Sequence, residues 1–202
     1  MPSPSKKPSR INGILIPAAI ILPMVVAYIM FYTGWGVPLM TTNKGEFLSP
    51  PQLVTELNIT GGDTQLADAV AEGSQKRWRL LLPVTADCSD ACADNLYLTR
   101  QVHIRLAQKA YRVERVLVLL GEFTEAERTA LEEEHRTTMM VPSTPEDFSQ
   151  WLQPVGLTAS EALEHYYLVD QNGYAMMRYN TTHSGQDLLG DVKKLLKYTY
   201  DK

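Results

Sequence analysis

Cys88 and Cys92 are the only cysteines among 202 residues, and they are the residues best suited to chemistry. They follow an apolar run directly and precede a segment with helical periodicity. Side chains at positions i and i+4 share one face of a helix, so the two sulfur atoms can meet. Two thiols that meet can perform thiol–disulfide exchange. With a third ligand they can hold a soft metal ion such as Cu(I).

Two structural explanations of the cysteine pair stay open beside redox or metal chemistry. A disulfide closing so short a loop would stabilise the fold by only about 2 kcal/mol, against roughly 4 to 5 kcal/mol for a hundred-residue loop. Inert buried thiols would not need the polar residues Ser89 and Asp90 between them. The short loop and the polar surroundings therefore favour a redox or metal role.

The helix that follows the pair makes Cys88 the expected nucleophile. The N-terminus of a helix stabilises a thiolate, and Cys88 is the cysteine nearer to that end. Asp87, Asp90 and Asp94 act in the opposite direction, because nearby negative charge raises the pKa of a thiol. We therefore expect a nucleophile that is not unusually acidic.

His165 is the best candidate for a third metal ligand among the four histidines. It directly precedes a predicted strand over residues 166–170, and in the sheet expected below the approach to that strand passes beside the cysteine loop. Its alternative role is that of a surface residue after the turn at residues 161–164. The remaining histidines lie within a predicted helix, at a helix end where a cation is favourable, and in a loop: His103, His135 and His183.

Apolar runs and helix-capping signals predict the elements that must position these residues. A capping box at Thr124 and an N-cap at Thr144 followed by proline mark two helix starts. Asn172-Gly173 is typical of a hairpin turn. Strands are expected over residues 76–84, 113–120, 137–141, 166–170 and 174–179, and helices over 91–111, 124–135, 144–153 and from Ser184 onward.

This pattern has the order β-α-β-α-β-α-β-β-α, which predicts a thioredoxin-like α/β fold. Strands that alternate with helices indicate a parallel sheet core, and the closing hairpin adds antiparallel strands at one side. In this order the cysteine pair falls where the first core strand turns into the first core helix. We place this domain at residues 75–202 and a tether, rich in Gly, Pro, Thr and Asn, at residues 34–74.

Residues 11–33 carry no charge and predict one transmembrane helix. About 22 helical residues rise ~33 Å, enough to cross a hydrocarbon core of ~30 Å. Membrane helices tolerate residues such as Pro17 and Pro23, and the aromatic residues between Tyr28 and Trp35 are typical of a membrane interface. A cleaved signal peptide is the alternative, but the run is longer than usual and no small-residue cleavage site follows it.

The charges predict the orientation of this helix in a bacterial inner membrane. Residues 1–10 contain Lys6, Lys7 and Arg10, so the positive-inside rule places them in the cytoplasm. The rest of the chain then lies beyond the lipid bilayer in the periplasm, where a cysteine pair can form a disulfide. All 23 acidic residues follow residue 43, with 16 of the 19 basic ones. An acidic domain repels phosphates, so we expect no nucleic-acid partner.

On these residues the chain resembles the Sco/SenC family, membrane-anchored thioredoxin-fold proteins of cytochrome c oxidase copper-centre assembly. The resemblance is carried by the predicted anchor, the strand, Cys-x-x-x-Cys and helix at residues 79–111, and the hairpin Tyr167–Gly173. Residues 43–51 are similar to an extended segment that some relatives carry. The resemblance covers most of residues 11–200. It implies copper as a ligand of Cys88, Cys92 and a histidine, and cytochrome c oxidase as a partner.

The chain departs from the family at three positions. The family histidine lies where this chain has Ser160–Ala162, and His165 comes three positions later. Ala93 replaces a proline that commonly follows the second cysteine. No proline precedes the hairpin strand, where disulfide oxidoreductases carry a cis-proline.

Three functions follow as hypotheses. The first is a Sco-like oxidase assembly factor whose cysteine pair performs redox chemistry and transfers Cu(I). The second is a non-catalytic thioredoxin-fold subunit or chaperone of a respiratory complex. The third is a periplasmic thiol reductase, which the missing proline disfavours. The residues alone leave open whether the protein is an enzyme.

Overall fold

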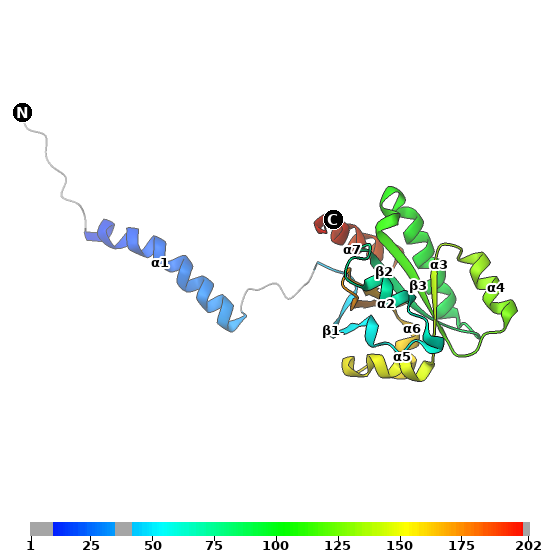
Figure 1. Cartoon of the computed structure of the whole chain (residues 1–202). Coiled ribbons are helices and arrows are strands. Elements are labelled where there is room, and N and C mark those ends of the chain that lie inside the picture. Colours follow the sequence, from blue (N-terminus) through cyan, green and yellow to red (C-terminus); the bar gives the residue numbers. More distant parts are fainter. Residues whose placement is uncertain (1–9, 35–41, 200–202) are drawn as a thin grey trace, which may run out of the picture. The chain divides into compact units, whose positions relative to one another are not determined.

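The computed structural model describes residues 10–34 and 42–199 (Figure 1). By its internal contacts the chain divides into two units, Met1–Thr42 and Asn43–Lys202. Each unit is described below by itself.

The first unit contains helix α1, Arg10–Thr33, with Pro17 and Pro23 inside it. Many of its described side chains are large, apolar and exposed; Phe31, for example, is 80% exposed. Among the described residues, no helix meets the combined requirements of length and hydropathy for crossing a membrane. The transmembrane helix predicted over residues 11–33 is therefore not confirmed here.

The second unit is built on one six-stranded sheet with the order β1-β6-β5-β2-β3-β4. Strands β2, β3 and β4 are parallel, and β5, β6 and β1 extend the sheet in antiparallel pairs. The strands are β1 (Glu46–Leu53), β2 (Trp78–Thr85), β3 (Val113–Leu120), β4 (Met139–Ser143), β5 (Tyr166–Val169) and β6 (Tyr174–Tyr179). The helices are α2 (Gln65–Val70), α3 (Asp90–Arg105), α4 (Glu125–Glu134), α5 (Pro145–Leu152), α6 (Ala159–Glu164) and α7 (Gly185–Tyr198).

The predicted α/β order from the first core strand to the last helix is confirmed. The capping box at Thr124 and the N-caps at Thr144 and Ser184 all form as the sequence indicates. The structure adds α6, a six-residue helix where only a turn was expected. Its capping box, in which Thr158 and Glu161 bond reciprocally, explains why so short a segment is helical.

Side chains from the two faces of the sheet form two hydrophobic clusters. One face packs against α3 and α7, whose buried residues include Leu96, Leu188 and Val192. The other packs against α5, α6 and the segment before β2, around Phe148 and Leu152. In Figure 1, α7 and α5 accordingly lie on opposite sides of the strands. Strand β2 is at the centre and is buried on both faces.

The tether predicted over residues 34–74 is wrong from residue 43 onward. Residues 46–53 form β1, which pairs with β6 at the edge of the sheet. Leu48, Val54, Leu57 and Leu66 are each at most 3% exposed and belong to the core. Their spacing shows neither strand nor helix periodicity, and tertiary packing rather than local pattern orders this segment.

A buried carboxylate fastens the start of this segment to the domain. Oδ2 of Asp191, on α7, accepts hydrogen bonds from the backbone N–H of Lys44 at 2.7 Å and of Gly45 at 3.1 Å. It also accepts one from the Tyr179 hydroxyl at 3.1 Å. Gly45 lies so close to the Tyr179 ring that a Cβ atom there would collide with it. Asp191 is only 3% exposed, so its buried carboxylate is the acceptor that holds the backbone N–H groups of Lys44 and Gly45.

We predict that Asp191→Asn lowers the free energy of unfolding by about 2–3 kcal/mol, because the buried donors lose a charged acceptor. Urea unfolding of the full chain measures the loss, and amide exchange should accelerate most at Gly45. Asp94→Asn, at an exposed position of α3, is the matched control and should change stability by less than about 0.5 kcal/mol. Equal stability of the two variants would contradict the assignment.

Candidate functional site

Cys88 and Cys92 form a disulfide in this structure, with their Cα atoms 5.4 Å apart. The bond lies directly after β2 and spans the start of α3, where the sequence predicted the pair to meet. Redox-active cysteine pairs lie at this junction in thioredoxin-like folds, so the site has the placement that thiol–disulfide chemistry requires.

Backbone hydrogen bonds at the junction hold the two cysteines in place. The N–H of Cys88 donates to the carbonyl of Thr85, the last residue of β2, at 3.1 Å. Ser89 is the N-cap of α3, and its hydroxyl accepts from the N–H of Cys92 at 3.3 Å. Cys88 therefore precedes the helix, and Cys92 lies in its first turn. The short polar stretch that the sequence singled out acts as the helix cap.

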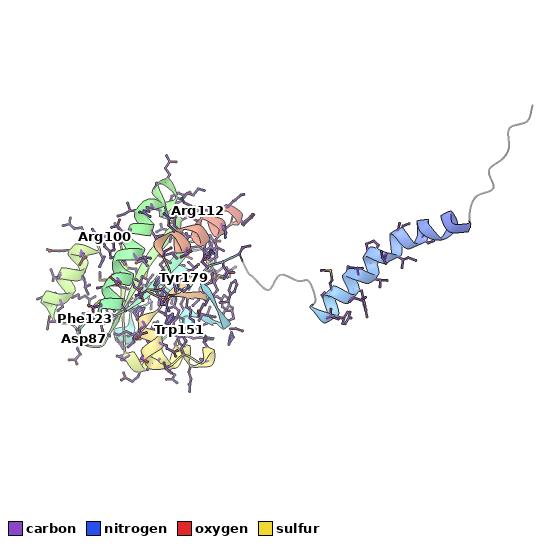
Figure 2. All side chains as sticks on the ribbon, turned by 180° about the vertical axis from the view of Figure 1, so that it is seen from behind. Asp87, Arg100, Arg112, Phe123, Trp151 and Tyr179 are labelled. Atoms are coloured by element: carbon purple, nitrogen blue, oxygen red, sulfur yellow. A yellow bond between two sulfur atoms is a disulfide. The ribbon has the colours of Figure 1, made fainter. Side chains whose placement is uncertain are left out.

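The two sulfur atoms differ in their access to solvent. Cys92 is 6% exposed and packs in the core cluster with Leu96. Cys88 is only half-buried and contacts the same cluster at its margin, as does Phe123. Figure 2 shows Asp87 and Phe123 at the same end of the domain. A partner thiol can therefore approach Cys88 more readily than Cys92.

The structure engages both ring nitrogens of His165 in hydrogen bonds. Nδ1 lies 2.5 Å from the carbonyl oxygen of Glu161, which can only accept, so Nδ1 carries the hydrogen and donates. Nε2 then accepts from the side-chain amide of Asn180 at 3.4 Å. The side chain is only 8% exposed. These contacts explain the position of His165 without a metal ion.

No group of three or more His, Cys, Asp or Glu side chains that could hold a metal ion occurs within the described part of the chain. The predicted ligand set Cys88, Cys92 and His165 is thus not assembled in this disulfide-bonded form. Nε2 of His103 donates to the backbone carbonyls of Ala110 and Val113. His183 bonds to the main chain and side chain of Asn180.

Sequence reasoning missed Asn95, which connects the cysteine helix to the end of α6, just before His165. Its side-chain amide donates to the carbonyl of Glu164 at 3.0 Å, and the residue is 4% exposed. Its Oδ1 has no hydrogen-bond partner in the part of the chain that the structure describes. Asn95 is seven positions after Cys88, so it shares the helix face of the two cysteines. A polar residue on that otherwise buried face was the available signal.

The fold and the cysteine pair define a thioredoxin-like protein. Residues 78–199 match the family model described as the transmembrane-like, thioredoxin-like, C-terminal domain. This match spans more than half of the chain, and the chain belongs to that family. No match was found among curated proteins.

Solved structures of the same fold include Sco proteins and a disulfide oxidoreductase. Copper-bound yeast Sco1 matches with a TM-score of 0.51 and 12% identity, over 62% of this chain and 82% of its own. A second structure of yeast Sco1 gives 0.51 and 11%, over 63% and 84%. A thiol:disulfide interchange protein from Bacteroides sp. gives 0.50 and 18%, over 80% and 95%. At such identities the similarity shows the shared fold alone.

The difference in exposure predicts unequal alkylation of the two cysteines after reduction. We expect iodoacetamide to modify Cys88 at least about tenfold faster than Cys92, because Cys92 is buried in the core cluster. Mass spectrometry of the alkylated peptides measures both rates in the full chain. In urea the rates should become equal, which serves as the control. A faster reaction at Cys92 in the native protein would refute the assignment of Cys88 as the attacking residue.

Proposed function

We propose that this protein is a membrane-anchored, Sco-like factor for cytochrome c oxidase assembly that acts by thiol–disulfide exchange at Cys88 and Cys92. The observation that carries the proposal is the disulfide at the β2–α3 junction, in which Cys88 is half-buried and Cys92 is buried. A structural staple over so short a loop would contribute only about 2 kcal/mol. Exchange with a partner instead needs one cysteine that the partner can reach and a second one that only the first can reach.

In the reduced form Cys88 would attack a disulfide of the partner and form a mixed disulfide, releasing one partner thiolate. The thiolate of Cys92 would then attack the sulfur of Cys88, restore the internal disulfide and release the second partner thiol. Two electrons pass from this chain to the partner. A dithiol of another redox protein must reduce the internal disulfide before the next cycle.

The local structure supports this order of events. The open N-terminal turn of α3 favours a thiolate at Cys88, which precedes it. Cys92 is covered, so it meets the Cys88 sulfur more readily than a partner. Asp87 and Asp90 are exposed beside the pair and give the partner-facing surface a negative charge.

The location and the partner are part of the proposal. Exposed apolar side chains on α1, such as Leu22 at 66% and Phe31 at 80%, favour a lipid bilayer over water as their surroundings. The basic residues Lys6, Lys7 and Arg10 support a periplasmic location of the domain at a bacterial inner membrane, by the positive-inside rule. The proposed partner is a respiratory complex, cytochrome c oxidase first, because the Cys-x-x-x-Cys segment and the hairpin resemble the Sco/SenC family.

Replacing Cys92 by Ala should trap the mixed disulfide, because no second thiolate remains to resolve it. We expect a reducible adduct between full-length Cys92→Ala protein and an oxidase subunit, identified by mass spectrometry after non-reducing electrophoresis. Cys88→Ala is the matched control and should give no adduct. Cells carrying Cys88→Ala should lose oxidase activity.

The second hypothesis, a non-catalytic subunit or chaperone of a respiratory complex, makes the opposite prediction for the cysteines. If the double Cys→Ala variant keeps both partner binding and oxidase activity, the exchange mechanism is refuted and the scaffold role is supported. Turnover of a model disulfide without any oxidase defect would instead support a general thiol reductase.

The Sco-like hypothesis also includes copper delivery, and tight copper binding depends on a third ligand. His165 can serve only if Nε2 leaves Asn180 and the disulfide is reduced, because both ring nitrogens are bonded here. We expect reduced full-length protein to bind Cu(I) no more tightly than a simple dithiol, and His165→Ala to leave the affinity unchanged. Asn180→Ala is a companion variant that would free Nε2. A weakening of about tenfold in His165→Ala would establish the three-ligand site and the copper role.

A further inference from the structure

A pocket of about 440 Å³ lies at the opposite end of the parallel strands from the disulfide. It is lined by residues of α3, by Arg115 near the start of β3, and by the end of α4 with the residues that follow it. Arg115 pairs with Leu80 in the sheet, and β2 runs on from Leu80 to Thr85 before the cysteines begin. Figure 2 likewise shows Arg100, on the rim of the pocket, well apart from Asp87. The pocket is therefore separate from the redox site.

One of the residues that line the pocket is a buried arginine with an unused hydrogen-bond donor. Arg115 is 5% exposed. One guanidinium nitrogen donates to the carbonyl of Leu96 at 3.2 Å and another to the hydroxyl of Thr138 at 3.5 Å. Among the residues that the structure describes, the buried Nε–H has no hydrogen-bond partner. Burial, followed by the charge of Arg100, lowers the pKa of Arg115 to about 10, so the side chain is still a cation at neutral pH.

A buried histidine supplies a second unpartnered nitrogen in the same pocket. His135 is 4% exposed, and its Nδ1 has no hydrogen-bond partner within residues 10–34 and 42–199. The sequence placed this residue as a cation at the end of a helix. The structure corrects that view, because burial first, and the charge of Arg115 next, lower the pKa of His135. A neutral imidazole carries one N–H, which can donate from Nδ1.

The other charged groups around the pocket are largely balanced. Arg100 forms an ion pair with Glu134 at 3.6 Å, and Arg136 donates from Nε to the carbonyl of Glu133 at 3.2 Å. Nε2 of His103 lies 2.8 Å from the carbonyl of Val113. Three arginines and two glutamates line the pocket, so their formal charges sum to one positive charge, and Arg115 is the buried one of the three cations.

We propose that this pocket binds a carboxylate group, and that the side chains of Arg115 and His135 shift to present the buried Nε and Nδ1 to its two oxygens. Buried donors without partners cost free energy, and a ligand that accepts from both would satisfy them. A carboxylate matches the two donors and the single positive charge. A phosphate dianion would bring more charge and more acceptors than the floor supplies, and Glu133 and Glu134 would repel it. The carboxylate belongs to a small organic acid or to the C-terminus of a peptide.

The test is a titration of the full-length protein with acetate, in detergent and at constant ionic strength. The NMR signals of the imidazole rings of its four histidines report binding. The signal of His135, assigned by its loss in His135→Phe, should shift saturably with acetate, with a Kd on the order of 1 mM. Acetamide has the same shape without the charge and should cause no saturable shift. Arg115→Lys should weaken acetate binding about tenfold, since it loses the Nε donor.

Arg105→Ala is the control for general electrostatics, because it removes an exposed cation of α3 outside this pocket and should leave binding unchanged. N-acetyl-alanyl-alanine and its C-terminal amide distinguish the two sources: tighter binding of the acid than of acetate indicates a peptide C-terminus, and equal binding a small acid. No saturable shift with acetate, an equal response to acetamide, or tighter binding of inorganic phosphate would each overturn the proposal. The first result would mean that water alone satisfies the buried donors.

Discussion

The position of β2 between β3 and β5 is the constraint on which the rest of the domain depends. The strand pairs in parallel with β3 along its whole length and antiparallel with β5, and both of its faces are buried. A side chain on such a strand is out of reach of a partner, as is Arg79 at 1% exposure, so the chain can present reactive groups only after Thr85, at the carboxyl end of the strand. Cys88 follows within three residues. The core thereby fixes where chemistry can occur.

Most of this arrangement could be predicted, because its signals are local. The run Val113–Leu120 and the caps at Thr124, Thr144 and Ser184 each mark an element through neighbouring residues. The spacing of the two cysteines likewise suffices to predict that their sulfur atoms meet. The contacts that the sequence does not reveal join residues far apart in the chain. Residues 46–53 join the sheet through β6, and Asp191 reaches back to Lys44, about 147 positions away.

The same limit applies to the buried polar residues. Arg115 lies in a run of valines and leucines that predicts a buried strand, and nothing local indicates that its guanidinium would reach the carbonyl of Leu96 on α3. His135 follows a helix rich in glutamate, where solvent exposure was the natural expectation. Burial of such groups depends on how α3 and α4 cover the sheet, which only the assembled fold specifies. The burial of Arg115 and His135 therefore could not be predicted from composition or periodicity.

Helix α3 links the two ends of the domain physically. Cys92 is in its first turn, Asn95 ties it to the residue before His165, and one turn after Cys92 the carbonyl of Leu96 accepts from Arg115. A helix held at both points has little freedom to shift when the disulfide opens. Exchange by Cys88 uses a half-buried side chain at the margin of the core, whereas a three-ligand metal site needs Nε2 of His165 to leave Asn180. The contacts around α3 therefore favour electron transfer over metal binding as the chemistry of this site.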